Sequence, residues 1–152
     1  MTGPSETVHG TCVAIDGRAI LLTGPSGSGK SDLALRLIDR GAALVSDDYT
    51  VLTEVDGTLI ASAPQRIAGK IEVRGVGIIE MPYIEDVPLA LILDLATAPP
   101  RYPEAPSEKV IAGVAMPLLP LSPWEASAPI KVALALRAFG LATEGHGVAP
   151  AP

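Results

Sequence analysis

The sequence predicts a single α/β domain in which strands outnumber helices and an early glycine-rich turn binds phosphate. Three observations predict this fold: short apolar runs separated by turn residues, only two stretches with helical periodicity, and the motif "GPSGSGKS" between a strand and a helix. A chain of 152 residues can bury one hydrophobic core. We expect residues 1–152 to form one P-loop domain, with flexible tails at 1–7 and 141–152.

The first elements surround the glycine-rich turn. The stretch "CVAIDGRAILLTG" predicts two strands joined at Asp16 and Gly17, a dipeptide typical of a type I′ hairpin turn. The second strand, residues 19–23, leads directly into the turn. Leucine spacing over residues 30–40 predicts an amphipathic helix, which Gly41 ends as a C-cap.

The rest of the chain is predicted to contain mostly strands. Residues 63–83 have no helical period, and we expect a loop, a short strand and a turn there. The continuous apolar run 87–96 is typical of a strand buried on both faces. A proline-rich loop is predicted at 97–110, and the last helix lies within 122–140, before Gly140. One shorter strand is predicted to end at Val45. Four others are predicted at residues 50–54, 59–62, 110–115 and 116–119.

Composition excludes several classes of partner. The net charge is −6 and no Lys/Arg cluster is present, so we expect no binding to nucleic acid. No run reaches the roughly 20 apolar residues that span a bilayer, and no signal peptide is visible. The single cysteine, Cys12, cannot form an internal disulfide, which suits the cytoplasm, and we expect it to be a small buried side chain. Aromatic residues make up only 3%, so stacking of adenine on a Trp or Tyr is not expected.

The turn matches G-x-x-x-x-G-K-[ST] completely. Glycines allow successive N–H groups to point at phosphate oxygens, Lys30 would reach the β- and γ-phosphates, and the Ser31 hydroxyl would bind Mg²⁺. An ordinary glycine- and serine-rich loop is the alternative, but the strand before the motif and the helix after it favour binding of ATP or another polyphosphate. The predicted binding residues are Gly24, Ser26, Gly27, Ser28, Gly29, Lys30, Ser31 and Asp32.

Five polar residues outside the turn are candidates for chemistry. Asp47 and Asp48 follow a buried strand; one could assist a metal and the other could take a proton, or both could lie in a solvated turn. Glu72 and Arg74 share one face of a strand, which suits a metal ligand and a phosphate clamp, but equally a surface ion pair. His9 precedes the first hairpin and is either structural or catalytic.

Together these segments resemble the kinase domain of the bacterial HPr kinase/phosphorylase family, whose nucleotide site is similar to that of phosphoenolpyruvate carboxykinases. The resemblance rests on "VHGTCVAIDGRAILLTGPSGSGKSDLALRLIDRGAALVSDD" and on "KIEVRGVGII", and it runs from about Val8 to Ile79. It implies a homo-oligomer that uses ATP and Mg²⁺ to phosphorylate a serine of HPr, a carrier protein of the sugar phosphotransferase system. In the family the same site can remove that phosphate by attack of inorganic phosphate, which releases pyrophosphate.

The resemblance also implies a role for each candidate residue. Asp47 would be the general base toward the serine hydroxyl and, protonated, the general acid in the reverse reaction. Asp48, coupled to His9, would orient the pair and help around the metal. The other implied roles are metal binding by Ser31 and Glu72, and support of the signature loop by Arg74.

The sequence departs from the family pattern at two places. Full-length relatives carry an additional N-terminal domain, and this chain resembles a short proteobacterial form without it. Relatives also have an arginine-rich loop before the last helix, whereas no arginine lies between Arg101 and Arg137 here, so we expect kinase activity more than phosphorylase activity. The alternatives are a small-molecule kinase, a relative of phosphoenolpyruvate carboxykinases, and a nucleotide sensor without catalysis.

Overall fold

The computed structural model describes residues 2–103 and 105–143, which form a strand-rich α/β fold with few helices, as predicted. No helix within these residues combines the length and the apolar character needed to cross a membrane. The elements are β1 (Thr2–His9), β2 (Thr11–Ile15), β3 (Arg18–Thr23), α1 (Lys30–Asp39), β4 (Ala43–Ser46), β5 (Tyr49–Val55), β6 (Thr58–Ser62), the 3₁₀-helix η1 (Gln65–Ile67), β7 (Lys70–Val73), β8 (Gly77–Glu80), β9 (Val87–Asp94), β10 (Ser107–Ile111), β11 (Val114–Pro120) and α2 (Ala128–Phe139).

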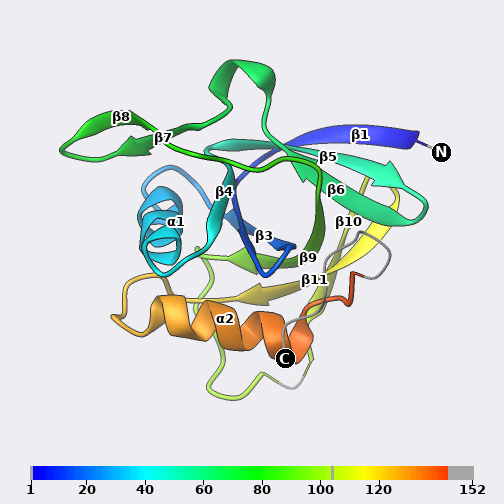
Figure 1. The fold of residues 1–152 in the computed structure, drawn as a ribbon. Helices are drawn as coiled ribbons and strands as arrows, with labels where there is room; N and C mark the ends of the chain where they lie inside the picture. Colours follow the sequence, from blue (N-terminus) through cyan, green and yellow to red (C-terminus); the bar gives the residue numbers. More distant parts are fainter. Residues whose placement is uncertain (1, 104, 144–152) are drawn as a thin grey trace.

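Most strands belong to one curled, mixed sheet. Its main path runs β1-β5-β6-β9-β3-β2-β4, and β10 joins through β11, which pairs with β9. The buried strand β9 lies parallel to β3 and β11 but antiparallel to β6, so the sheet forks along this strand. Figure 1 shows the curl, with both helices outside it and the separate β7–β8 hairpin projecting above α1. The predicted mixed sheet is therefore confirmed.

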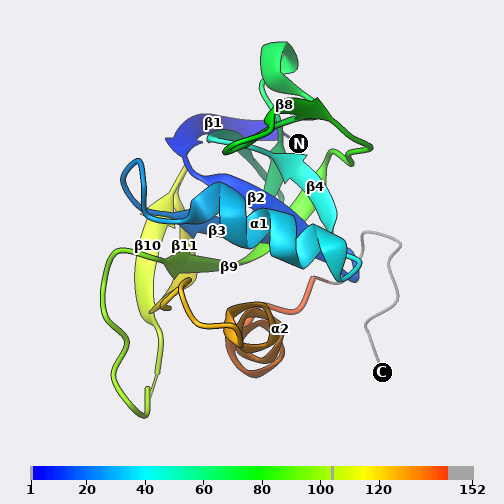
Figure 2. The same cartoon turned by 90° about the vertical axis from the view of Figure 1, so that its left-hand side faces the viewer.

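The helices cover the outer face of the sheet. Leu33 and Leu37 of α1 and Val132 and Leu136 of α2 are buried in one cluster with Leu91 of β9. These positions repeat every four residues in each helix, so each helix turns one apolar stripe to the sheet. Figure 2 shows α1 lying across the strands with α2 below it.

A second cluster fills the inside of the curl. It joins Leu52 of β5, Ile92 of β9 and Met116 of β11, all buried. The backbone N–H of Ala112, in the β10–β11 turn, donates to Glu6 Oε1 of β1 at 3.2 Å. This contact links β1, at one end of the main path, to the β10–β11 branch.

The prediction of a flexible tail at residues 1–7 is wrong for residues 2–7, which the structure describes. Thr2–His9 forms β1, which pairs antiparallel with β5 and adds a contact between the hydroxyls of Ser5 and Thr53 at 2.7 Å. Most side chains of β1 are exposed, so the strand has no apolar alternation that the sequence could reveal. Backbone pairing holds it instead.

Two predictions near the C-terminus also need correction. The turn between β10 and β11 lies at Ala112 and Gly113, which both have positive φ, and not between residues 115 and 116. The proline-rich loop is correspondingly shorter, because β10 already begins at Ser107.

The predicted C-terminal tail begins with a fixed residue. The N–H of Leu141 donates to the Ala90 carbonyl at 2.9 Å, and Arg18 Nη1 donates to the Leu141 carbonyl at 3.3 Å. Residues 144–152 of that predicted tail lie outside the described residues.

Candidate functional site

Two loops that are distant in sequence leave the same edge of the sheet. Strands β3 and β4 both run antiparallel to β2, so they end at the same edge. The glycine-rich loop of residues 24–29 follows β3, and Asp47 and Asp48 follow β4. The hydroxyl of Thr23, at the end of β3, donates to the Leu93 carbonyl of β9 at 3.1 Å and fixes the start of the loop. Ligands of α/β sheets commonly bind at the carboxyl ends of strands.

The backbone of the glycine-rich loop adopts conformations that only glycine takes without strain. Gly24, Gly27 and Gly29 have φ of 148°, 85° and 92°. Gly29 is also the N-cap of α1, and no side chain caps the helix there. The N–H groups of the first turn are thus left for an anion or for water.

Ser28 carries a hydroxyl in the loop that lacks a hydrogen-bond partner. Its Oγ is buried and has no hydrogen-bond partner among the described residues. A Cβ at Gly24 would collide with this Oγ, so the loop depends on the absence of a side chain there. A buried hydroxyl without a partner is costly, and a phosphate oxygen would satisfy it. The loop therefore fits a phosphate group.

Lys30 provides the positive charge of the loop. Its ammonium is buried beneath the loop and donates to the carbonyls of Gly24, at 2.6 Å, and Pro25, at 3.1 Å. Burial lowers the pKa of Lys30, while the carboxylates of Asp48 and Asp47 oppose that shift. A bound phosphate would also favour the charged form.

Asp47 is buried and holds three elements together. Its Oδ1 accepts hydrogen bonds from Ser31 Oγ of α1 at 2.6 Å and from Thr11 Oγ1 of β2 at 3.1 Å. Its Oδ2 accepts the backbone N–H of Glu72, on β7, at 3.0 Å. Both oxygens are thus engaged, and the carboxylate fixes the hydroxyl that is the candidate metal ligand.

Asp48 points to solvent instead. Its side chain is 58% exposed, and its Oδ1 lies 3.0 Å from Nε2 of His9. The backbone has φ of 69°, which turns the chain sharply, and the Asp48 N–H donates to Thr11 Oγ1 at 3.2 Å. The adjacent aspartates therefore face different surroundings, as strand alternation predicts. The solvated-turn alternative fits Asp48 in part and does not fit Asp47.

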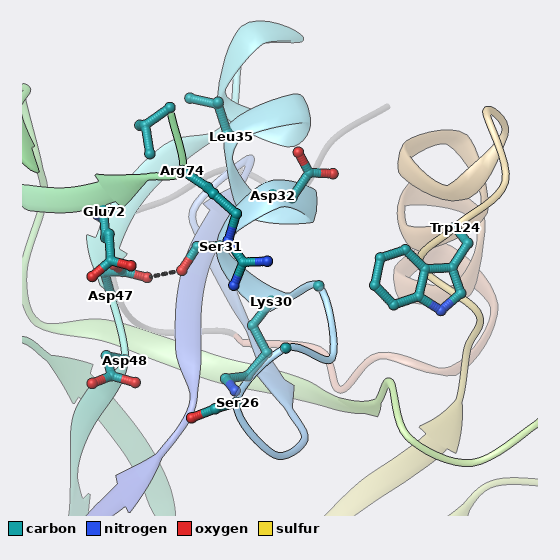
Figure 3. Close-up of a pocket in the computed structure, with 13 residues that line it drawn as sticks. Ser26, Lys30, Ser31, Asp32, Leu35, Asp47, Asp48, Glu72, Arg74 and Trp124 are labelled. Atoms are coloured by element: carbon teal, nitrogen blue, oxygen red, sulfur yellow. Dashed lines mark hydrogen bonds between the residues drawn. The ribbon is translucent and has the colours of Figure 1, made fainter. Parts of the chain in front are cut away.

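Glu72 and Arg74 approach from the β7–β8 hairpin. Both side chains line the pocket with Asp47, Asp48 and the glycine-rich loop, and Figure 3 shows Glu72 beside Asp47. In the described part of the chain no ion pair joins Glu72 to Arg74, so the surface ion-pair alternative is not supported.

The pocket of about 470 Å³ is more acidic than basic. Its lining carries two cationic side chains, Lys30 and Arg74, against the four carboxylates of Asp32, Asp47, Asp48 and Glu72. A polyphosphate would meet this negative charge unless a divalent cation accompanied it.

The oxygen donors at the pocket suit Mg²⁺. The described residues contain no group of three or more His, Cys, Asp or Glu arranged for a metal. Mg²⁺ commonly takes one or two protein ligands and completes its shell with water and substrate phosphates. The Ser31 hydroxyl, with the carboxylates of Glu72 and Asp47 beside it, provides oxygens of that kind.

The structure brings nearly all predicted site residues together. Gly24 and Ser28 form the base of the loop, and His9 reaches the site through Asp48. The predicted residues that line the pocket itself are Ser26, Gly27, Gly29, Lys30, Ser31, Asp32, Asp47, Asp48, Glu72 and Arg74.

Sequence reasoning missed four residues of the site. Thr11 positions both aspartates, and Leu35, Val73 and Trp124 line the pocket. Thr11 lies two residues after His9 and directly before a predicted strand, a position that could have drawn attention to it. Trp124 belongs to no motif that the sequence makes visible.

Comparison with known proteins gives one family. Residues 2–84 match the family model described as "HPr Serine kinase C-terminal domain". The chain is 46% identical over 94 residues to the HPr kinase/phosphorylase of Clostridium tetani, covering 62% of this chain and 30% of that protein. It is 50% identical over 78 residues to the HPr kinase/phosphorylase of Clostridium botulinum, covering 51% of this chain and 26% of that protein. The chain thus spans less than a third of these curated relatives.

A solved structure extends the similarity beyond those segments. The structure of the Hpr(Ser) kinase/phosphatase from Coxiella burnetii matches with a TM-score of 0.75 at 29% sequence identity. The match covers 87% of this chain and 94% of that chain. The structural match therefore covers more of this chain than either curated relative, at 87% against 62% and 51%.

Proposed function

The chain belongs to the HPr serine kinase C-terminal domain family, and from this premise we propose that it transfers the terminal phosphate of ATP to a serine of an HPr-type phosphocarrier protein. The HPr kinase/phosphorylases of Clostridium support this substrate class through their names. The site supports it through a phosphate-binding loop placed opposite an exposed carboxylate.

The glycine-rich loop would hold the phosphates of ATP. N–H groups of the loop and of the first turn of α1 would surround them, and the Lys30 ammonium would neutralise part of their charge. The buried hydroxyl of Ser28 supports this role, because it has no partner among the described residues.

Ser31 and Glu72 would hold Mg²⁺, which offsets the charge of the phosphates when bound. The Ser31 hydroxyl donates a hydrogen bond to Asp47 Oδ1 at 2.6 Å, so the oxygen lone pairs of Ser31 can turn toward a metal. The contact of Asp47 with the Glu72 N–H, at 3.0 Å, ties the β7–β8 hairpin to the same point. Asp47 is thus a positioning residue in this proposal.

The exposure and orientation of Asp48 carry the proposal. A general base must reach the proton of an incoming hydroxyl, and Asp48 is exposed at the pocket while Asp47 is buried with both oxygens engaged. We therefore assign the general base to Asp48 in place of Asp47. His9, 3.0 Å from Asp48, would orient its carboxylate.

In the forward reaction the acceptor serine gives its hydroxyl proton to Asp48 while its oxygen forms a bond to the γ-phosphorus. The bond from that phosphorus to the bridging oxygen breaks, and ADP leaves. Such transfer depends mainly on positioning and charge neutralisation, which the loop, Lys30 and Arg74 would supply. In the reverse direction protonated Asp48 would return the proton to the serine oxygen.

The β7–β8 hairpin fits a protein acceptor better than a metabolite. Its tip presents Val76 and Ile78, which are 71% and 69% exposed, next to Arg74 in the pocket. Exposed apolar side chains beside a site mark a surface that a partner can cover. This observation favours a carrier protein over a small molecule.

The pocket offers little positive charge for phosphorolysis, the reverse activity named in the relatives. Only Lys30 and Arg74 bring positive charge into the lining of the pocket within the described residues. A phosphoserine and an inorganic phosphate would have to bind there together. Homo-oligomerisation and a cytoplasmic location stay predictions.

The direct test is incubation of the chain with purified HPr, ATP and Mg²⁺, followed by mass mapping of the modified residue. We expect one phosphoserine on HPr, and its loss in the variant Asp48→Asn. Transfer to a metabolite in a pool of candidates would instead indicate a small-molecule kinase. Tight ATP binding with no transfer to HPr or its nitrogen-regulatory paralogue would indicate a nucleotide sensor.

A further inference from the structure

Trp124, the single tryptophan of the chain, lies in the pocket of the glycine-rich loop. It belongs to the segment before α2, and its side chain is 67% exposed. Figure 3 shows its indole on one side of the loop and Asp47, Asp48 and Glu72 on the other. The ring lines the pocket while most of its surface stays accessible, so it can contact a ligand that is held there.

The backbone on both sides of the indole is held in place by α1. Arg36 donates from Nη2 to the Pro123 carbonyl at 2.5 Å and from Nη1 to the Glu125 carbonyl at 3.3 Å. Arg36 is in turn paired with Asp32, at 3.1 Å, on the same helix. The segment around Trp124 is therefore already ordered, so that binding of a ligand there loses little conformational entropy.

The glycine-rich loop itself packs against this segment. A Cβ at Gly29 would lie 3.2 Å from both Pro123 Cγ and Trp124 Cη2. Such distances leave little room for a side chain, so glycine at position 29 allows the indole to stand directly beside the loop. The distance from the ring to the phosphate-binding amides is thus set by the fold.

We propose that Trp124 is the stacking platform for the base of the nucleotide, an inference that rests on the function proposed above. In the proposed function the reacting end of the polyphosphate would lie on the side of the carboxylates. The base would then lie toward the opposite side of the loop, where the indole offers a flat apolar face. The low aromatic content predicts no such platform, but the fold brings the single tryptophan to the place where one is needed.

Stacking gives a specific pattern of affinities. Removal of an aromatic platform typically weakens binding of a stacked base by about 5- to 150-fold. Every base has a π-face, so stacking alone discriminates little between ATP and GTP. A polyphosphate without a base gains nothing from the ring.

The test combines tryptophan fluorescence with calorimetry on the full chain, using the Mg²⁺ complexes of ATP, GTP and tripolyphosphate. We expect both nucleotides to change the Trp124 emission and tripolyphosphate to bind without that change. Trp124→Ala should lose about 5- to 150-fold in affinity for ATP and keep its affinity for tripolyphosphate, while Trp124→Phe keeps most of both. Tyr102→Ala, which removes an aromatic side chain that is 77% exposed outside the pocket, is the matched control.

The outcomes separate this inference from the proposed function. Equal losses of ATP and tripolyphosphate affinity in a folded Trp124→Ala variant would mean that the residue only supports the loop, and would overturn the inference. Unchanged ATP affinity in both Trp124 variants would overturn it as well. If the unmodified chain binds neither ATP nor tripolyphosphate, the phosphate site fails and the proposed function fails with it.

Discussion

The two neighbouring aspartates should respond differently to the same substitution. Asp48→Asn keeps the shape of the side chain but removes the proton acceptor. Loss of a general base typically costs about 10² to 10⁴ in rate. The contact between Asp48 and His9 is exposed on both sides, and such pairs contribute at most about 1 kcal/mol. We therefore expect Asp48→Asn to lose phosphate transfer, while its thermal stability and affinity for Mg²⁺-ATP stay close to those of the unmodified chain.

Asp47→Asn should instead act on the structure. The buried carboxylate accepts three hydrogen bonds, from Ser31, Thr11 and the Glu72 N–H. An asparagine has one oxygen and one NH₂ group, so at least one of these donors loses its acceptor. An unsatisfied buried donor costs about 1 to 3 kcal/mol, which corresponds to a melting temperature lower by roughly 2 to 12 °C for a domain of this size. Affinity for Mg²⁺-ATP should fall too, because Ser31 loses its fixed orientation.

The assay for this pair measures three quantities on each variant: the single-turnover rate of HPr phosphorylation, the melting temperature, and the affinity for Mg²⁺-ATP. Asp39→Asn, which changes an exposed carboxylate at the far end of α1, is the control. The reasoning is refuted if Asp48→Asn transfers phosphate within a factor of ten of the normal rate. It is also refuted if Asp47→Asn keeps its melting temperature and loses only transfer.

Three further predictions follow from the site. Gly24→Ala should lose ATP affinity by at least about tenfold in calorimetry, because its Cβ would collide with the Ser28 side chain and distort the glycine-rich loop. Gly57→Ala, also at positive φ but with open space around its Cβ, should lose stability alone. Val76→Ser combined with Ile78→Ser should raise the KM for HPr several-fold and leave ATP affinity unchanged; Val110→Ser, an exposed apolar position on β10, should change neither. Removal of Mg²⁺ by EDTA should weaken ATP binding at least about tenfold in calorimetry, because the lining is acidic.

The sequence allowed the elements around the site to be predicted because each carries a local signal. The helix Lys30–Asp39 has apolar spacing and a glycine after it, and β9 is a continuous apolar run. β1 has no such signal, since its side chains are mostly exposed and its pairing with β5 is set by backbone hydrogen bonds. The β10–β11 turn was misplaced because Ala112, a residue without turn preference, takes a positive φ there.

The parts of the site that local patterns predict are those whose residues are close in sequence, whereas His9, Glu72 and Arg74 gained their roles from the family resemblance. The glycine-rich loop and the adjacent aspartates are local motifs, and alternation along the strand already predicts that the aspartates diverge. Which one is buried depends on Thr11, Ser31 and the Glu72 N–H, which come from three different elements. Trp124 reaches the pocket only through the packing of its segment on α1, which no local pattern encodes.

For the proposed reaction, the arrangement of charge in the pocket would favour transfer toward the protein acceptor. A neutral serine hydroxyl can approach Asp48 without repulsion, whereas a phosphoserine would bring two negative charges to the same carboxylate and to Glu72 beside it. Of the two cationic side chains in the lining, Lys30 already lies under the glycine-rich loop, so Arg74 is the one on the hairpin side that could attract a phosphoserine. In the proposed reaction the phosphorylated product would therefore be repelled more strongly than the substrate, which would favour release after phosphorylation and oppose the reverse reaction.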